Sequence, residues 1–238
     1  MFGRRAVSGR VLSIGADRIR VGPWRGDAAT AYLAPIPNGR PLRAATIRAC
    51  IDEIVAEGYV HIFTAALSIE ERGPFPAMGF SEREQLHLLA HEMTRLPPPP
   101  SVKLRRGRRS DRRSALAVDR AAFSQFWQLD ADGLDDALHA TPAVRFRVAG
   151  TSAIAGYAVT GRAGDRGYLQ RLAVHPGHQG AGLGMTLVSD SLHWLHRRGV
   201  QQTIVNTQVD NQRALQLYDR AGFELQANGL TVFELALP

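Results

Sequence analysis

The sequence of 238 residues has only one cysteine, Cys50, and only one lysine, Lys103. A single cysteine excludes a disulfide framework within the chain and any cysteine-based zinc site. There is no run of about 18 apolar residues, and the arginines near the N-terminus do not lead into an apolar signal core. The sequence therefore predicts neither a membrane span nor a secretion signal, and we expect a cytoplasmic protein.

Because lysine is nearly absent, the basic charge is carried almost entirely by arginine. The formal net charge is +7 and the isoelectric point is near 10.4. Such a chain attracts anionic partners, which include nucleotide cofactors, nucleic acid and acidic membranes. Hydrophobic residues make up 45% of the chain, enough to bury a real core, and the length predicts two modest domains.

Four consecutive prolines at positions 97–100 give the clearest boundary in the chain. A polyproline run is stiff and extended and fits into neither a helix nor a sheet, so we predict a linker over residues 97–101. The predicted domains are then residues 1–96 and 102–238. The Arg-rich run at 103–113 directly follows the linker. It is either a nucleic-acid patch or, as we favour, a solvated strand end followed by a helix start.

Helix and strand patterns alternate after the linker. The two helices expected first are at 110–123, with Ser110 or Asp111 as a cap, and near 130–140. Later elements are predicted as three neighbouring antiparallel strands between residues 143 and 174, a helix at 182–198, a strand at 203–205, a helix that Asp210 or Asn211 caps and Gly222 ends, and a last strand near 230–237. This pattern predicts an α/β (α+β) fold, with a mixed, mostly antiparallel sheet between helices.

A weak internal repeat relates the two predicted domains. The stretch "IRACIDEIVAEG", "VHIFTAA" and "PFPAMGF" in the first half mirrors "LVSDSLHWLHRRG", "QQTIVNT" and "LYDRAGF" in the second. The first copy has no counterpart of the helices at 110–123 and 130–140. We therefore expect two tandem copies of one fold, of which the first is truncated.

The stretch "HPGHQGAGLGMTL", residues 175–187, places four glycines between a strand and a helix. A helix N-terminus exposes backbone N–H groups that attract phosphate, and glycines allow a diphosphate to approach them. A Walker loop is excluded because no lysine follows the last glycine. A dinucleotide fingerprint is a poor match because Met185 takes the place of a glycine and the next strand ends without an acid.

These residues resemble the GNAT superfamily, the acetyl-CoA-dependent N-acetyltransferases. "QGAGLG" at 179–184 matches the pyrophosphate signature of that family, "RLAVHP" resembles its fourth strand, and "NQRALQLYDRAGF" resembles its last conserved block. The three pieces have the family's order and spacing within residues 102–238. The resemblance implies the GNAT fold, acetyl-CoA as cosubstrate, and a small-molecule or protein amine as acceptor.

The resemblance also implies the roles of individual residues. A bulge would splay the fourth strand from the fifth, the strand would bind pantetheine, and the glycine-rich amides would bind the diphosphate. The phenol of Tyr218 would protonate the departing thiolate as general acid, after direct attack of a neutral amine on the thioester. The implied cofactor-binding residues are Leu172, Ala173, Val174, Gln179, Gly180, Ala181, Gly182, Leu183, Gly184 and Asn211.

Other assignments stay open at this stage. Tyr218 lies on an apolar stripe and could be a packed aromatic, and Asn211 could be a helix cap alone. The strands contain no carboxylate for a general base, which leaves Tyr168, Gln170 or a chain of waters. His87 and His91, four apart on a predicted helix, have no third ligand, so we predict no metal site.

The first copy carries "NGRPLR", residues 38–43, where the second has its glycines. Pro41 removes an amide, Arg43 adds bulk, and Phe75 replaces Tyr218. We expect this half not to bind acetyl-CoA, and to complete the fold, cover a sheet edge or shape the acceptor cleft. The alternative function is a non-catalytic protein of the same fold, which senses acyl-CoA or binds nucleic acid through residues 103–113.

Overall fold

The computed structural model of the protein describes residues 9–36, 38–100, 102–150 and 153–238. The first eight residues, in which the sequence shows no secretion signal, lie outside the described residues, and so does Ser101 of the predicted linker. Residue contacts divide the chain into two compact units. The first unit contains the chain up to Leu88, together with residues 208–210 and 227–238, and the second contains residues 89–207 and 211–226.

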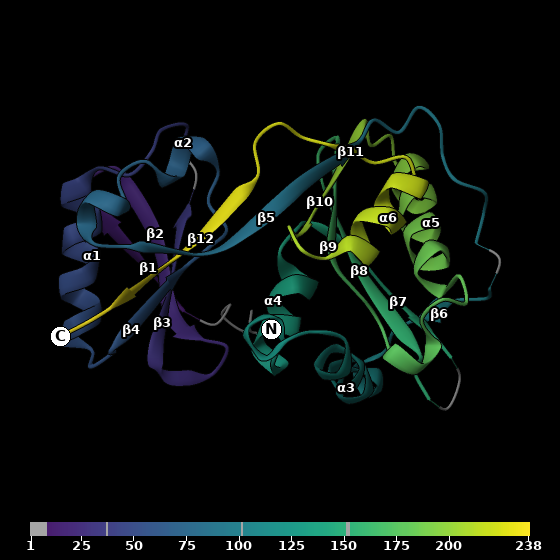
Figure 1. The fold of residues 1–238 in the computed structure, drawn as a ribbon, viewed down its shortest axis with the longest axis horizontal. Helices are drawn as coiled ribbons and strands as arrows, with labels where there is room; N and C mark the ends of the chain where they lie inside the picture. Colours follow the sequence, from purple (N-terminus) through teal and green to yellow (C-terminus); the bar gives the residue numbers. More distant parts are fainter. Residues whose placement is uncertain (1–8, 37, 101, 151–152) are drawn as a thin grey trace, which may run out of the picture. The chain divides into compact units, whose positions relative to one another are not determined.

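The first unit is a mixed sheet with α1 against one face (Figure 1). Its strands lie in the order β1-β2-β3-β4-β12-β5, and only β3 and β4 are parallel among its pairs. Its elements are β1 (Arg10–Ile14), β2 (Asp17–Trp24), β3 (Asp27–Ile36), α1 (Ala44–Ala56), β4 (His61–Thr64), α2 (Ile69–Arg72), the 3-10 helix η1 (Pro76–Met78), β5 (Ser81–His91) and β12 (Leu230–Ala236).

Alternation along the strands of the first unit builds its core. Ile62 and Thr64 of β4 are buried, whereas His61 and Phe63 between them are half-buried on the other face. α1 contributes Ile47, Cys50 and Ile54, each 0% exposed, to the same core. Cys50 therefore fills the core, as the apolar face of this helix predicts.

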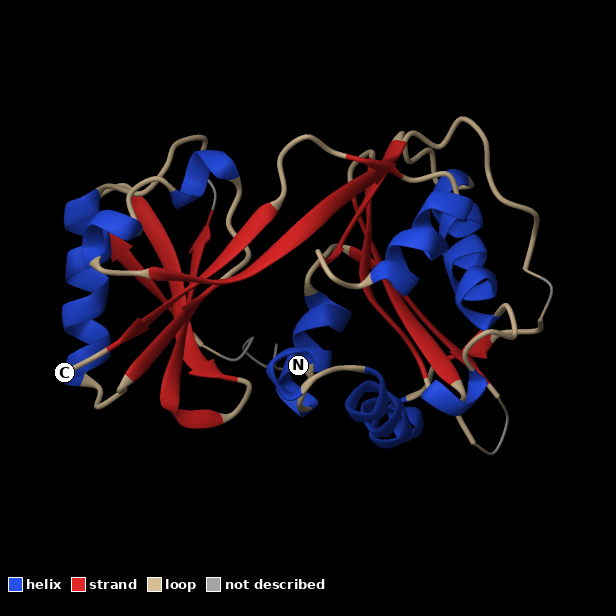
Figure 2. Ribbon diagram, viewed as in Figure 1, coloured by secondary structure: helices blue, strands red, loops and turns tan. Residues whose placement is uncertain are grey.

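The second unit is a sheet of strand order β10-β9-β8-β7-β6, with helices on both faces (Figure 2). β6, β7, β8 and β9 pair antiparallel in turn and β9 pairs parallel with β10, which confirms the predicted mixed, mostly antiparallel sheet between helices. Its elements are β6 (Arg105–Arg106), η2 (Arg109–Asp111), α3 (Arg112–Ala122), η3 (Gln125–Trp127), α4 (Ala131–His139), β7 (Ala143–Ala149), β8 (Gly156–Ala163), β9 (Arg166–Val174), η4 (Pro176–His178), α5 (Leu183–His196), β10 (Gln202–Gln208), α6 (Gln212–Arg220) and β11 (Glu224–Leu225).

The central strand β8 explains why this sheet has two helical layers. Its residues 156–161 are all buried, so both faces of the strand need a cover. Tyr157 and Val159 pack in the cluster with α3 and α4. On the opposite face, the Thr160 hydroxyl donates to Ser191 Oγ of α5 at 2.7 Å. The helices predicted from sequence at 110–123, 130–140 and 182–198 thus enclose the sheet.

The segment around His87 and His91 differs from the sequence prediction. It was expected to be helical, but it forms the strand β5, which pairs with β12 through Leu230–Leu86 and with β11 through Leu225–Leu89. The spacing of its leucines fits a helix locally, but these long-range strand pairs outweigh that preference. β5 begins in the first unit and ends in the second.

The four prolines do not form a free spacer between the units. The backbone carbonyl of Pro98 accepts a hydrogen bond from Ser189 Oγ at 2.5 Å, and that of Pro97 lies 3.0 Å from His193 Nε2. Both partners lie on α5, so the segment belongs to the second unit. The predicted boundary at 97–101 therefore differs from the observed division, and so does the assignment of β12, which completes the sheet of the first unit.

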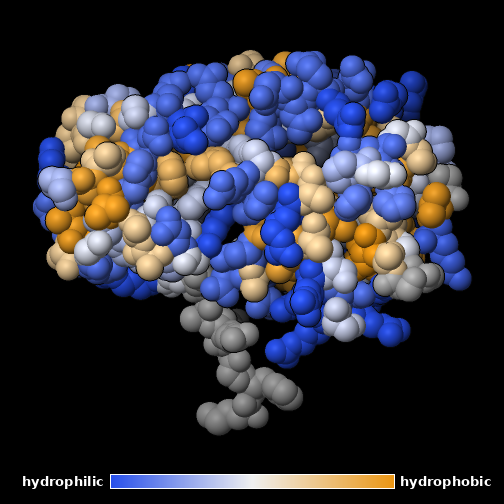
Figure 3. Space-filling model, turned by 60° about the horizontal axis from the view of Figure 1, so that its bottom comes forward, coloured by the Kyte–Doolittle hydropathy of each residue, from blue (hydrophilic) through white to orange (hydrophobic). Residues whose placement is uncertain are grey.

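The Arg-rich run 103–113 contains the end strand β6 and the start of α3, as predicted. Neither Ser110 nor Asp111 caps this helix with its side chain. The Asp111 carboxylate instead accepts from Arg105 at 2.7 and 2.8 Å, and this interaction lowers its pKa to about 2. Figure 3 shows one face of the molecule, where hydrophobic residues form small separate groups among hydrophilic ones. No helix in the described parts of the chain is long and apolar enough to cross a membrane.

Candidate functional site

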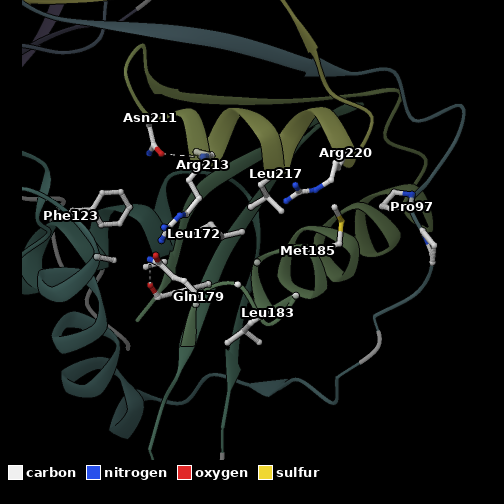
Figure 4. A pocket seen from close by; sticks show the side chains of 18 residues that line it. Pro97, Phe123, Leu172, Gln179, Leu183, Met185, Asn211, Arg213, Leu217 and Arg220 are labelled. Carbon is white, nitrogen blue, oxygen red and sulfur yellow. Dashed lines mark hydrogen bonds between the residues drawn. The ribbon is translucent and has the colours of Figure 1, made fainter. Parts of the chain in front are cut away.

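A cavity of about 950 Å³ in the second unit lies between the end of β9, the glycine-rich turn and α6 (Figure 4). Its volume is near the upper end of the roughly 300–1,000 Å³ typical of small-molecule sites. The lining residues are Pro97, Pro98, Ala122, Phe123, Leu172, Ala173, Val174, Gln179, Gly180, Gly182, Leu183, Gly184, Met185, Asn211, Arg213, Ala214, Leu217 and Arg220.

Strand β9 separates from β10 beside this cavity. The parallel pairing of the two strands ends at Tyr168–Ile204, although β9 continues to pair with β8 as far as Val174. The register with β8 shifts between Val159 and Thr160, which leaves Gln170 as the extra residue of a bulge. The backbone edge of β9 after Tyr168 thus has no partner from β10 and is available to a ligand.

The glycine-rich turn leaves a row of backbone donors without acceptors. The N–H groups of residues 180 and 182–185 donate no hydrogen bond to any described part of the chain. Gly182 is the N-cap of α5, in the left-handed conformation at φ +78°, and no side chain caps the helix. The positive end of the helix dipole and the amides of residues 180 and 182–185 therefore meet at one wall of the cavity, as an anion site requires.

Glycine is required at the positions of this turn for different physical reasons. Gly180 and Gly182 have positive φ, and an added Cβ would meet no atom within 4 Å, so they set the turn and keep the amides open. At Gly184 a Cβ would come within 3.1 Å of Leu217 Cδ2. This third glycine therefore lets α6 approach α5 closely, a role that differs from the exposed backbone expected for it.

Two arginines of α6 supply positive charge. Arg213 and Arg220 are exposed, line the cavity and form no ion pair with a described residue. Arg213 extends from α6 toward Gln179 (Figure 4). Since no carboxylate lines the cavity, its electrostatic environment favours an anionic ligand. These arginines were not predicted as site residues from the sequence; their spacing along an amphipathic helix after Asn211 was the available signal.

Side chains fix the two ends of the turn and the start of α6. Gln179 Nε2 donates to the carbonyl of Val174 at 2.9 Å, so this side chain closes the strand end onto the turn. The Asn211 side chain accepts from the Ala214 amide at 3.1 Å, which confirms it as a helix cap, and Asn211 also lines the cavity. Gly222 ends the helix with φ +89°, as predicted.

Tyr218 lies behind the cavity wall. It is 6% exposed, packs against Phe223 and is not a lining residue. Burial raises the pKa of its phenol to about 12, so that the group is protonated at neutral pH. Of the eleven predicted site residues, Tyr218 and the exposed Ala181 are the two that do not line the cavity.

The candidates for a general base lie on β9. Gln170, the bulged residue, packs so close to Gly161 that a Cβ there would come within 2.6 Å of its Nε2. Its Oε1 is buried, and no described residue donates to it. No group of three or more histidine, cysteine, aspartate or glutamate side chains among the described residues is arranged as metal ligands are.

A buried acid lies beside the N-terminus of helix α1 in the first unit. The carboxylate of Asp17 is fully buried at the start of α1, where it accepts from Thr46 Oγ1 at 2.6 Å and lies 3.4 Å from both Arg40 Nη2 and Arg43 Nε. The hydrogen bond from Thr46 is the main reason that the pKa of Asp17 is lowered. The helix N-terminus beside residues 38–43 thus already has an anion from within the chain.

The sequence around the cavity is similar to a known protein family. Residues 113–223, just under half of the chain, match the model of the Acetyltransferase (GNAT) family. The chain is 38% identical over 58 residues to N-alpha-acetyltransferase 30 of Schizosaccharomyces pombe, which is 24% of this chain and 39% of that protein. It is 43% identical over 53 residues to the mycothiol acetyltransferase of Rhodococcus jostii, 22% of this chain and 17% of that protein. The matched segments thus span well under half the length of these relatives.

Solved structures resemble the chain over nearly its whole length. A tandem GNAT protein from the clavulanic acid biosynthesis pathway is 17% identical with a TM-score of 0.71, covering 95% of this chain and 81% of that one. A GCN5-related N-acetyltransferase from Sphaerobacter thermophilus is 16% identical with a TM-score of 0.63, covering 93% and 76% of the chains. These likenesses concern the fold, whereas the family match concerns the sequence around the cavity: residues 113–223 match the GNAT acetyltransferase family.

Proposed function

We propose that the second unit transfers an acetyl group from acetyl-CoA to a primary amine. The observation that carries this proposal is the row of five unpaired backbone N–H groups at residues 180 and 182–185, in the wall of a cavity without carboxylates. Such a row fits a diphosphate, and the family match makes the diphosphate of CoA the natural occupant.

The cavity has separate places for the parts of acetyl-CoA. The diphosphate would lie on the amides of residues 180 and 182–185, and Arg213 and Arg220 would neutralise its charge. The pantetheine chain, with its alternating amides and apolar links, matches the unpaired edge of β9 at residues 172–174 and the apolar wall made by Leu217. Asn211 would line the same channel.

The chemical step follows from these positions. Bound acetyl-CoA supplies an activated acetyl thioester. A neutral amine attacks its carbonyl carbon directly, forming the C–N bond, and an amide of β9 donates to the developing oxyanion. The nitrogen loses its extra proton to water, the carbonyl re-forms and the C–S bond breaks. The phenol of Tyr218 gives its proton to the departing thiolate, which its raised pKa permits because the proton is present at neutral pH. No covalent intermediate with the protein is needed.

The first unit is proposed to be a degenerate copy of the same fold. Asp17 occupies the helix end that a diphosphate would need, and Phe75, at the counterpart of Tyr218, is 0% exposed in the core. The tandem GNAT structure, which matches 95% of this chain, supports this proposal. We assign no acceptor beyond the class of amines, because the family's acceptor loops follow no common pattern.

Thermal unfolding with acetyl-CoA tests the cavity. Ligand at about a hundred times its Kd adds roughly 2.7 kcal/mol of stability, a shift of several degrees. Gly182→Arg should lose this shift, because the side chain fills the diphosphate position. Gly199→Arg is the matched control: it too has a positive φ, +71°, with no atom within 4 Å of an added Cβ, but it lies outside the cavity.

Two outcomes would contradict the proposal. A native protein that is folded but unshifted in excess acetyl-CoA has no such site, and equal shifts in both variants place the ligand elsewhere. Release of free thiol on addition of amines then separates the enzyme from a non-catalytic acyl-CoA sensor. Salt-dependent binding of nucleic acid without thiol release would favour the nucleic-acid-binding alternative.

A further inference from the structure

A second cavity, of about 410 Å³, lies wholly within the first unit. It is enclosed by α2, the middle of β5, the start of β12 and two short loops. The lining residues are Ile69, Arg72, Gln85, Leu86, His87, Val209, Ala227, Asn228, Gly229, Leu230 and Thr231. None of them belongs to the acetyl-CoA cavity of the second unit. The volume suits a small metabolite.

Arg72 is the charged group of this cavity. Its guanidinium is half-buried, and Nη1 donates to Oγ1 of the buried Thr231 at 3.1 Å. Among the described residues, no carboxylate forms an ion pair with it, and its other N–H groups have no acceptor. The neighbouring Glu71 is engaged elsewhere, accepting from the Ser68 amide at 2.9 Å.

A half-buried cation without a counter-charge is costly, because desolvation removes water without replacing its hydrogen bonds. No aspartate or glutamate is among the eleven lining residues. The fork of guanidinium N–H groups matches a carboxylate in charge and in geometry, through two parallel hydrogen bonds. One guanidinium, with no second cation in the lining, balances a single negative charge better than the two charges of a phosphate.

The remaining walls describe the body of the ligand. Ile69, Leu86, Val209 and Leu230 are apolar, and Ile69 and Val209 are 43% and 40% exposed, more than an interior position would leave them. An apolar ligand surface would cover them. The polar ends of His87 and Asn228 can supply further hydrogen bonds, whereas Gln85 Nε2 already donates to Glu82 Oε2 at 2.8 Å.

The loop walls are fixed in position on β5. A Cβ on Gly229 would lie 2.4 Å from the carbonyl oxygen of Leu86, so only glycine permits this close approach. The Val209 amide donates to the carbonyl of Gln85 at 3.4 Å. The cavity is therefore largely formed before any ligand binds, which lowers the entropic cost of binding.

We propose that this cavity binds a small organic monocarboxylate, whose carboxylate pairs with Arg72 while its apolar body covers Ile69, Leu86, Val209 and Leu230. The site goes beyond the proposed acetyl transfer and is independent of it, because no residue of the acetyl-CoA cavity takes part. The carboxylate ligand is therefore separate from the amine acceptor of the second unit, and its binding requires the Arg72 contact.

Ligand-observed NMR titration of the full chain with hexanoate, in a buffer without carboxylates or acetyl-CoA, tests the site. The native protein should bind hexanoate, and Arg72→Gln should weaken that binding by about tenfold or more, the usual loss when a hydrogen-bonded charge is removed. Arg48→Gln is the matched control, because Arg48 is an exposed arginine of the same unit that does not line the cavity. It should bind as the native protein does.

Hexanamide and inorganic phosphate complete the test. Hexanamide has the same apolar body without the charge and should bind at least about tenfold more weakly. The proposal would be overturned if hexanamide or phosphate bound the native protein as tightly as hexanoate does or more tightly. It would also be overturned if a folded Arg72→Gln bound hexanoate as tightly as the native protein. In the presence of acetyl-CoA, the native protein and Gly182→Arg should bind hexanoate with the same affinity. A failure of the acetyl-CoA site is therefore distinguishable from a failure of this site.

Discussion

In the cavity of the second unit, proposed to bind acetyl-CoA, single residues leave backbone N–H groups without acceptors and so determine which ligand can bind. Gly180 and Gly182 keep a row of amides open, whereas Gly184 serves the packing of α6 on α5. The sequence pattern placed all of them in one motif, because spacing alone cannot separate a glycine that faces a ligand from one that faces a helix. Leu217, whose side chain distinguishes them, is more than thirty residues away along the chain.

Tyr218→Phe tests the proposed acid. Without the phenolic proton the thiolate leaves unassisted, so thiol release should fall by about 10²- to 10⁴-fold, while acetyl-CoA still raises the melting temperature. Because burial raises the pKa of the phenol to about 12, its ionisation should reduce the rate of the native enzyme only above about pH 10. A phenylalanine variant that retains full turnover would make Tyr218 a packing residue.

At the scale of elements, one buried ion pair joins α3 to β9 beside the cavity. Arg171 of β9 donates twice to Asp119 of α3, at 2.7 Å each, and also to the carbonyl of Trp127. Tyr157 donates to the same carboxylate at 2.5 Å. The guanidinium lies 3.6 Å from the centre of the Phe123 ring, which lines the cavity. This network therefore positions the segment after α3 against the strand.

Asp119→Ala should destabilise the second unit by about 3–5 kcal/mol, because it leaves the mostly buried Arg171 without its counter-charge. Urea unfolding followed by tryptophan fluorescence measures the loss. The double variant Asp119→Ala with Arg171→Leu should recover a large part of it, since no unpaired charge remains. Equal instability of the double variant would assign the loss to the packing of Asp119 alone.

Some helices and strands could be predicted from the local sequence pattern, and others could not. The helices α3, α4, α5 and α6 and the strands β7 to β9 follow from their own periodicity and punctuation, because the apolar pattern and the turn residues of each lie within a short segment. β5 did not, because its partners β11 and β12 come from the end of the chain. The prolines at 97–100 were misjudged for the same reason, since their carbonyls bond to α5, about ninety residues later.

For the whole molecule, the two units differ in what lies at one helix N-terminus. In the second unit the amides before α5 are open, and in the first the carboxylate of Asp17 already lies at the start of α1. The sequence predicted this loss from Pro41 and Arg43, but it did not identify Asp17, which precedes the helix by a whole hairpin. A buried acid of this kind is visible only once the fold brings it to the helix.

This difference predicts that each chain binds one acetyl-CoA. Isothermal titration of the native protein should give a stoichiometry of one, and Gly182→Arg should reduce it to zero. Asp17→Ala removes the internal anion but leaves Pro41 and Arg43 in place, so its stoichiometry should also remain one, although the first unit loses the hydrogen bond from Thr46. A stoichiometry of two for the native protein would mean that the first unit also binds the cosubstrate. A stoichiometry of one that persists in Gly182→Arg, while Gly199→Arg behaves as the native protein does, would mean the same. Either result would contradict the proposed division of roles between the units.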